Sequence, residues 1–134
     1  MVSITSSGEY VAVIHTQGQN GAGNITSVAN ALNYLEVENE LIESPNEMDK
    51  YSKVILPGVG SFKRSINLLE KRNLDVAIKD FISVPSNKFL GICLGMQLLY
   101  DFSEEDGGCR GLGIIKGTVN RLAESDGFKV PNVG

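Results

Sequence analysis

The chain has 134 residues, of which 42% are hydrophobic and 21% charged, and its formal net charge at pH 7 is −4. The length suits a single domain with a buried core. The negative charge and the lack of a basic cluster argue against a nucleic-acid partner. No apolar run approaches the roughly 20 residues of a membrane span.

Cysteine and histidine are scarce. The sequence holds Cys93, Cys109 and a single histidine, His15. With no close pair of ligands, neither a metal nor another cofactor is expected. The polar segment 1–9 has no hydrophobic stretch typical of a signal peptide, so we expect a reduced, cytoplasmic setting.

Predicted strands and helices alternate along the chain. A helix with Asn24 as its N-cap follows the first strand, and the stripes of 62–69 and 74–81 indicate two further helices. A fourth stripe, formed by Leu94, Leu98 and Phe102, predicts a helix after Cys93. The expected strands are 10–14, 37–42, 53–56, 88–92, 113–122 and 128–133.

This alternation predicts an α/β fold, an open and mostly parallel doubly wound sheet of the flavodoxin-like type, with helices on both faces. An acidic, glycine-rich loop is expected over 103–111 and a turn over 125–127. We find no linker or internal repeat, so residues 1–134 are treated as one domain.

The segment Gly91-Ile-Cys-Leu-Gly95 has the pattern of a nucleophile elbow with sulfur in place of the serine oxygen. A strand that turns directly into a helix strains the central residue, and flanking glycines leave room for the turn. Such a turn would expose the Cys93 thiol at a helix N-terminus, where the dipole favours thiolate. The alternative is a buried structural cysteine at the end of a strand.

Parallel strands bring their carboxyl ends to one rim, where such sheets bind ligands. His15, Gly58-Val59-Gly60 and Cys93 each follow a predicted strand and should share that rim. The glycine loop could direct backbone NH groups to the cysteine and, with the NH of Leu94, form an oxyanion hole. A plain strand-to-helix turn would also explain these glycines.

Segments spread over nearly the whole chain resemble the class I, triad-type glutamine amidotransferases: 21–28, 56–62, 90–99, 103–105, 111–113, 117–119 and 129–131. The elbow marks the wider superfamily. Together with Pro57-Gly-Val-Gly60 and Gly21-Ala-Gly-Asn24, it is most similar to the glutaminase subunits of imidazole glycerol phosphate synthase, from histidine biosynthesis.

The resemblance implies a mechanism. Cys93 would attack the side-chain amide of glutamine, form a thioester and release ammonia to a synthase (cyclase-type) subunit in a heterodimer. The backbone NH groups of Val59 and Leu94, in the setting of Gly58 and Gly60, would hold the oxyanion. Gln97 and Glu105 would bind the amino-acid end of glutamine.

The sequence departs from the family pattern in three ways. Gly134 ends the chain within an expected strand, before the His-x-Glu that completes the triad, so we expect a domain incomplete at its carboxyl end and inactive alone. The 15–20 connection is longer than in the family and lacks its usual Asp-Tyr. Asn132 stands where the histidine-pathway subunits usually have histidine.

Four alternatives stay open. The chain could serve a sugar-aminating enzyme of surface polysaccharide synthesis, or act as an incompetent scaffold or interaction module. His15 could replace the missing base. Gly18, Gly21 and Gly23, with Glu43 at the end of the second strand, weakly resemble a dinucleotide-binding fingerprint, but their spacing differs from G-x-G-x-x-G.

Overall fold

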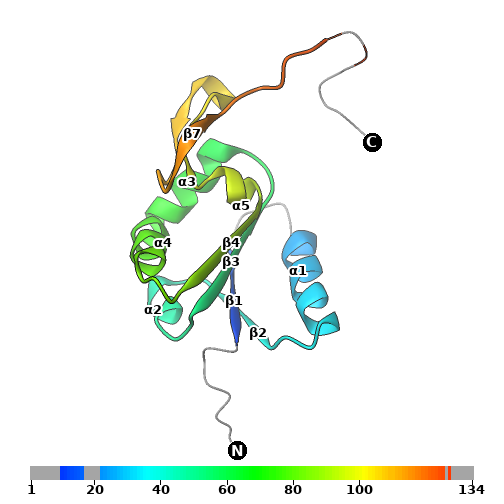
Figure 1. Ribbon diagram of the computed structural model, residues 1–134, viewed down its shortest axis with the longest axis vertical. Helices are drawn as coiled ribbons and strands as arrows, with labels where there is room; N and C mark the ends of the chain where they lie inside the picture. Colours follow the sequence, from blue (N-terminus) through cyan, green and yellow to red (C-terminus); the bar gives the residue numbers. More distant parts are fainter. Residues whose placement is uncertain (1–9, 17–21, 126, 128–134) are drawn as a thin grey trace, which may run out of the picture.

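The computed structural model describes residues 10–16, 22–125 and 127. These residues contain five α-helices, one 3-10 helix (η1) and seven strands, and the strands form two sheets (Figure 1). In chain order the elements are β1 (Val11–Ile14), α1 (Ala22–Tyr34), β2 (Asn39–Ile42), α2 (Pro45–Met48), β3 (Lys53–Gly58), α3 (Phe62–Lys71), α4 (Leu74–Ser83), β4 (Lys88–Cys93), α5 (Leu94–Gln97), β5 (Tyr100–Ser103), η1 (Glu105–Gly107), β6 (Cys109–Arg110) and β7 (Ile115–Val119).

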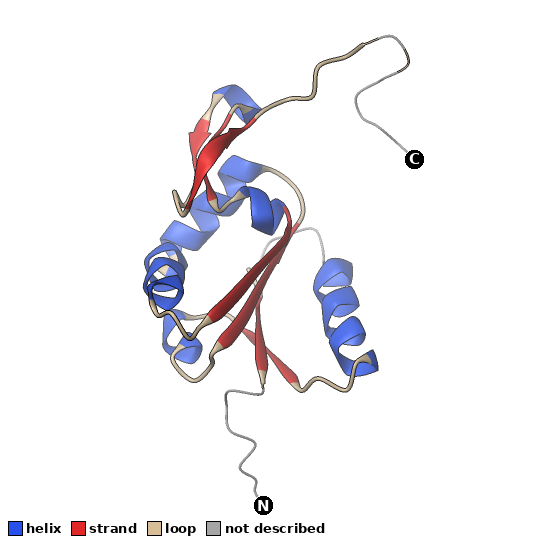
Figure 2. Cartoon of the chain, in the orientation of Figure 1, coloured by secondary structure: helices blue, strands red, loops and turns tan. Residues whose placement is uncertain are grey.

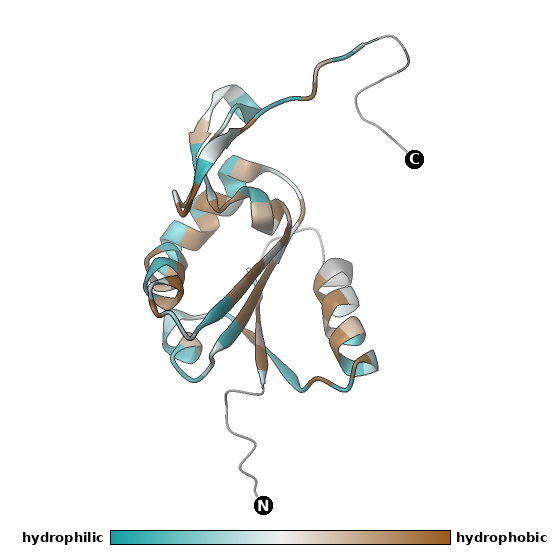
Figure 3. Cartoon of the chain, viewed as in Figure 1, coloured by the Kyte–Doolittle hydropathy of each residue, from teal (hydrophilic) through white to brown (hydrophobic). Residues whose placement is uncertain are grey.

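The main sheet has four parallel strands in the order β2-β1-β3-β4. Helix α1 covers one face, and α2, α3 and α4 cover the other (Figure 2). A sheet covered on both faces needs strands that are apolar throughout. All four residues of β1 are buried, and Figure 3 shows this strand coloured as hydrophobic. The predicted doubly wound α/β fold is confirmed.

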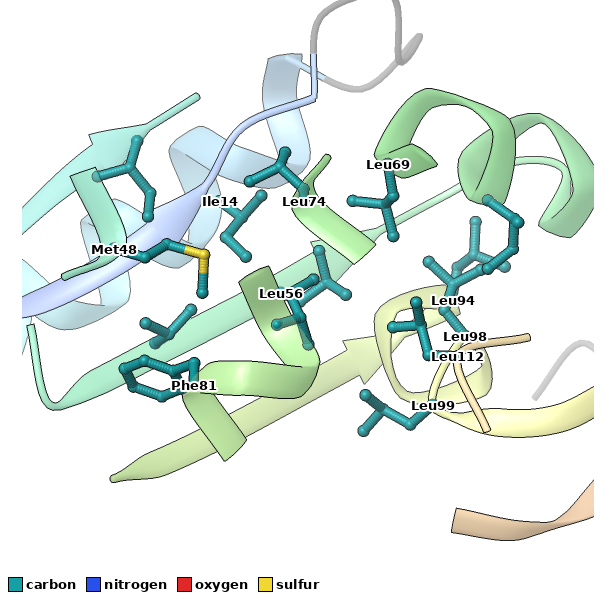
Figure 4. Packing of buried hydrophobic residues seen from close by; sticks show 14 of the residues in the cluster. Ile14, Met48, Leu56, Leu69, Leu74, Phe81, Leu94, Leu98, Leu99 and Leu112 are labelled. Atoms are coloured by element: carbon teal, nitrogen blue, oxygen red, sulfur yellow. The ribbon is translucent and has the colours of Figure 1, made fainter. Parts of the chain in front are cut away.

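Alternate strand residues supply two separate cores. Val13 and Ile55 point to the α1 side, where they pack with Ile25. Ile14 and Leu56 point to the opposite side, into the larger core formed with α3, α4 and α5. Figure 4 shows Leu56 at the centre of this core, between residues of the α4 region and Leu94, Leu98 and Leu112. The larger core therefore reaches the segment that follows Cys93.

The helix predicted for the stripe Leu94, Leu98 and Phe102 is wrong beyond its first turn. Helix α5 ends at Gln97, and Phe102 lies in β5 with 39% of its surface exposed. The carbonyls of Leu98 and Tyr100 accept hydrogen bonds from the amides of Leu112 and Gly113, at 2.7 and 3.1 Å, and not from a following helical turn. Long-range pairing has overridden the local periodicity.

Strand β5 is the centre of a small second sheet, pairing antiparallel with β6 and parallel with β7. A Cβ at Gly111 would lie 2.0 Å from the carbonyl oxygen of Tyr100, so only glycine allows the two segments to approach this closely. The predicted loop 103–111 therefore contains the end of β5, η1 and β6.

Two other predicted element boundaries differ from those in the structure. Asn24 is not an N-cap, because α1 begins at Ala22, a strong helix former. The strand predicted over 113–122 is reduced to β7. The strand predicted over 128–133 lies outside the described residues.

The Glu47 side chain stabilises the N-terminus of the short helix α2. One Glu47 carboxylate oxygen accepts hydrogen bonds from the backbone amides of Glu43 and Ser44, at 2.9 and 3.0 Å, and from the Ser44 hydroxyl. The Glu43 amide makes the largest contribution to holding the pKa of the Glu47 carboxyl below its usual value, followed by the Ser44 amide.

We predict that Glu47→Ala lowers the melting temperature at pH 7. Because the folded-state pKa is depressed, this stabilisation is present above the unfolded pKa, near 4.5, and is lost as the pH falls through the folded value. The difference in melting temperature between Glu47→Ala and wild type should therefore narrow below about pH 4. Thermal unfolding followed by circular dichroism measures it. Glu38→Ala, at an exposed loop carboxylate, is the control, and an equal gap at pH 7 and pH 3 would contradict this account.

Candidate active site

Cys93 has the backbone geometry of a nucleophile elbow. It is the last residue of β4 and precedes the first residue of α5, with φ 54° and ψ −120°. A non-glycine residue with positive φ is strained, and such residues concentrate at functional sites. The thiol is free and exposed, so the alternative of a buried structural cysteine is not supported.

Glycines let α5 lie directly on the ends of β3 and β4. A Cβ at Gly95 would lie 1.8 Å from the carbonyl oxygen of Leu56, and one at Gly91 would lie 2.6 Å from Cα of Met96. The contact at Gly58 is tight but less severe, since a Cβ there would lie 3.1 Å from the Gly95 nitrogen. The glycines of the motif are therefore required by packing around the turn, as the sequence predicted.

The Gly58-Val59-Gly60 loop lies beside Cys93. In the parallel β3–β4 ladder, Gly58 is the register partner of Cys93, so the loop and the thiol share one rim. Gly60 has φ +102°, which turns the chain sharply towards α3. This placement agrees with the predicted oxyanion loop, while the hydrogen-bonding role of the Val59 and Leu94 amides stays a prediction.

Gln97 and Glu105 line one pocket of about 460 Å³. Gln97 ends α5 and Glu105 begins η1, so the pocket lies between the elbow helix and the small sheet. Its other lining residues are Ser103, Glu104, Asp106, Val119, Asn120 and Arg121. The structure thus brings the two predicted substrate-binding residues to one pocket. Gln97 is about one helical turn after Cys93, which does not itself line the pocket.

A larger pocket, of about 700 Å³, lies elsewhere. It includes Tyr51 and Asn87, which precede β3 and β4, and therefore lies at the amino ends of the strands. Parallel sheets bind ligands at the opposite, carboxyl rim. We assign the site to the rim that carries Cys93.

His15 also lies at the carboxyl rim, but it is not next to Cys93. Its Nδ1 is 3.1 Å from a carboxylate oxygen of Glu43, which follows β2, and its carbonyl oxygen accepts a hydrogen bond of 3.3 Å from Arg72. Strand β3 separates β1 from β4, which puts the two strands roughly 10 Å apart. These contacts argue against His15 as a base for Cys93.

The sequence did not single out Ser61 or Asp106, which meet at the site. The Ser61 hydroxyl donates a 2.9 Å hydrogen bond to Asp106, 45 residues away. A serine before a helix suggests a cap, and Ser61 does cap α3, but nothing local predicts its partner.

Two other kinds of feature, a metal-binding cluster and a membrane-spanning helix, are absent from the described part of the chain. Within 10–16, 22–125 and 127, no three His, Cys, Asp or Glu side chains are grouped so as to hold a metal ion. In the same residues, no helix combines the length and apolar character required to cross a membrane. The glycines 18 and 21 of the dinucleotide-binding alternative lie outside the described part, while Glu43 is paired with His15.

The sequence matches the model of the family "Glutamine amidotransferase class-I" over residues 18–128. The chain belongs to this family. It is 45% identical over 114 residues to imidazole glycerol phosphate synthase subunit HisH of Prochlorococcus marinus, and 42% identical over 114 residues to the subunit of that name from Bacillus cereus. Each match covers 85% of this chain, and 55% and 53% of the two relatives.

The fold of this family member has a counterpart among solved structures. A crystal structure of a glutamine amidotransferase superposes with a TM-score of 0.69, at 20% identity, over 83% of this chain and 56% of the other. At that identity the likeness concerns the fold alone. The chain spans about half the length of the curated relatives it matches.

We predict that Gly95→Ala destabilises the protein by about 2 kcal/mol or more, because the added methyl group would overlap the Leu56 carbonyl and force α5 off β3. Chemical denaturation measures the free energy of unfolding. Met96→Ala is the matched control in the same helix turn. Its side chain is 47% exposed, so the loss should be about 0.5 kcal/mol or less. Equal stability of wild type and Gly95→Ala would contradict the packing described here.

Proposed function

We propose that this chain carries the nucleophile and substrate-binding part of a glutaminase that supplies ammonia to a synthase subunit. The observation that carries the proposal is the exposed Cys93 thiol, held at positive φ on the carboxyl rim of a parallel sheet. The family membership and the names of the relatives support glutamine as the substrate.

The chemistry follows from the elbow. The Cys93 thiolate adds to the amide carbon of glutamine, and the backbone amides of Val59 and Leu94 donate to the resulting oxyanion. Collapse breaks the carbon–nitrogen bond, the nitrogen takes a proton and leaves as ammonia, and a thioester remains. Water then adds to the thioester, which releases glutamate and regenerates the thiol. Helix α5 has only four residues, so it is too short to supply the long helix dipole that the sequence led us to expect at Cys93.

The pocket fits the amino-acid end of the substrate. Gln97 is four residues after Cys93, about one helical turn or 5.4 Å along the axis. The amide carbon and the α-carbon of glutamine are separated by three carbon–carbon bonds, and the α-ammonium and α-carboxylate groups lie one bond further on, which puts them within reach of a side chain one helical turn away. Glu105 supplies a carboxylate for the α-ammonium group of glutamine. Gln97 supplies an amide that can hydrogen-bond to either the α-ammonium or the α-carboxylate group.

The recipient of ammonia is inferred from the relatives. Both are named as subunits of imidazole glycerol phosphate synthase, so we infer a synthase partner of that type and a place in histidine biosynthesis. Asn132, which distinguishes this sequence from the histidine-pathway pattern, lies outside the described residues.

We predict that a glutamine-derived chloroketone alkylates Cys93 with saturation kinetics, because the pocket binds the amino-acid end before the thiol reacts. Intact-mass and peptide mapping measure the rate and the position of the adduct. Cys93→Ala should abolish the adduct, and Cys109→Ala is the matched control, since Cys109 is the other free thiol. Equal rates with the L and D reagents, or labelling of Cys109 alone, would contradict glutamine recognition.

Turnover tests the catalytic part of the proposal. The sequence has one histidine, His15, whose side chain is paired with Glu43. His15 follows β1, which lies two strands away from the strand that carries Cys93. Loss of triad members costs several orders of magnitude in rate. We therefore expect the 134-residue chain to release glutamate at least ~1,000-fold more slowly than a triad-complete glutaminase of the family, as measured by a coupled glutamate assay. Steady release at the family's rate, abolished by His15→Ala, would instead make His15 the general base.

A further inference from the structure

Two loops of the site, far apart in the sequence, are joined by one side-chain hydrogen bond. We call residues 58–60 the oxyanion loop and residues 103–108 the substrate loop. The Ser61 hydroxyl, directly after the oxyanion loop, donates to a carboxylate oxygen of Asp106 in the substrate loop at 2.9 Å. Ser61 is two residues from Val59, and Asp106 is adjacent to Glu105.

Each partner of this bond is held in place by its own element. Ser61 caps α3, because its hydroxyl oxygen accepts from the Arg64 amide at 3.4 Å and its carbonyl oxygen from the Ser65 amide at 3.1 Å. The cap fixes the side chain at the start of a ten-residue helix whose first residue, Phe62, is fully buried. The donor is therefore attached to the rigid part of the fold.

Asp106 is held in a conformation that most residues avoid. Its φ of 51° and ψ of 39° lie in the left-handed region, and Gly107 and Gly108 follow with φ of 81° and 104°. Aspartate and asparagine tolerate this region better than other non-glycine residues. The substrate loop is also tied down at Ser103, whose buried hydroxyl accepts from the Glu105 amide at 3.2 Å.

From this geometry we propose that Asp106 is a positioning residue which, through Ser61, fixes the substrate loop to the oxyanion loop. The inference rests on the proposed function. Asp106 would set where the Glu105 carboxylate stands relative to Val59 and Cys93, and so the distance between the two ends of a bound glutamine. Glu105 and Asp106 line the same pocket as Gln97, which makes this coupling direct.

An alternative role for Asp106 is simple attraction of the substrate ammonium by its charge. The two roles differ in what they require. Positioning requires an acceptor for Ser61 and a residue that tolerates positive φ, both of which asparagine supplies. Attraction requires the negative charge, which asparagine lacks.

The test uses four variants of the 134-residue chain and the glutamine chloroketone. Asp106→Gly keeps the permitted backbone but removes the acceptor, Asp106→Asn keeps both, and Ser61→Gly removes the donor while glycine still serves as an N-cap. The fourth variant combines Ser61→Gly with Asp106→Gly. We expect Asp106→Gly and Ser61→Gly to raise the half-saturating reagent concentration about threefold to tenfold, with a limiting alkylation rate within about twofold of wild type.

The double variant should be no worse than either single variant, because both remove the same bond, and Asp106→Asn should stay within about twofold of wild type. A loss in Asp106→Asn equal to that in Asp106→Gly would overturn the proposal in favour of charge attraction. Additive losses in the double variant would equally overturn it.

Hydrogen exchange provides a readout that does not depend on glutamine. The Gly108 amide donates to the Glu105 carbonyl at 3.1 Å within the substrate loop. Its exchange should be at least threefold faster in Ser61→Gly than in wild type and unchanged in Asp106→Asn, whereas exchange in the centre of α4 should not change. If wild type does not distinguish the L from the D reagent, the proposed function fails. Hydrogen exchange of the Gly108 amide then still tests whether the Ser61–Asp106 hydrogen bond holds the substrate loop. Unchanged Gly108 exchange in Ser61→Gly would show that the contact does not hold the loop.

Discussion

The strained backbone of Cys93 is the constraint on which the rest of the site depends. Holding a non-glycine residue at φ 54° costs about 1–3 kcal/mol, and this conformation persists only where the surrounding structure determines it. Here the determining contacts are backbone on backbone, since α5 lies against the Leu56 carbonyl with no room for a side chain at Gly95. The thiol is exposed because its neighbours on both sides are packed.

The parallel sheet provides that packing. The buried strands β1 and β3 anchor the ends from which the rim loops leave, and Leu94 and Leu98 extend the larger core beneath the elbow. The same core receives Leu112, which ties the small sheet to the main one. The pocket with Gln97 and Glu105 lies where the small sheet meets α5. The exposed Cys93 thiol therefore lies directly beside the core, and the Ser61–Asp106 hydrogen bond joins the two loops of the candidate site.

Local signals predicted part of this arrangement. The glycines around Cys93 specify the elbow through sterics within five residues, and the alternation of apolar segments specifies the order of strands and helices. The stripe Leu94, Leu98 and Phe102 misled the prediction because Leu98 and Tyr100 find hydrogen-bond partners in the 112–113 segment, an approach that Gly111 permits. The contact of Ser61 with Asp106 spans 45 residues and has no local pattern at all. Features set by neighbouring residues were predictable, and those set by distant backbone pairing were not.

The central claim is that Cys93 is a nucleophile towards the side-chain amide of glutamine. The most direct measurement is intact-protein mass spectrometry of the chain after incubation with L-glutamine and acid quenching, with peptide mapping of the adduct. Because no histidine stands next to Cys93 to speed water attack, the account predicts that a glutamyl thioester, equal in mass to glutamine minus ammonia, accumulates on Cys93 with release of one equivalent of ammonia. No adduct on Cys93 under saturating glutamine, or an adduct on Cys109, would contradict it.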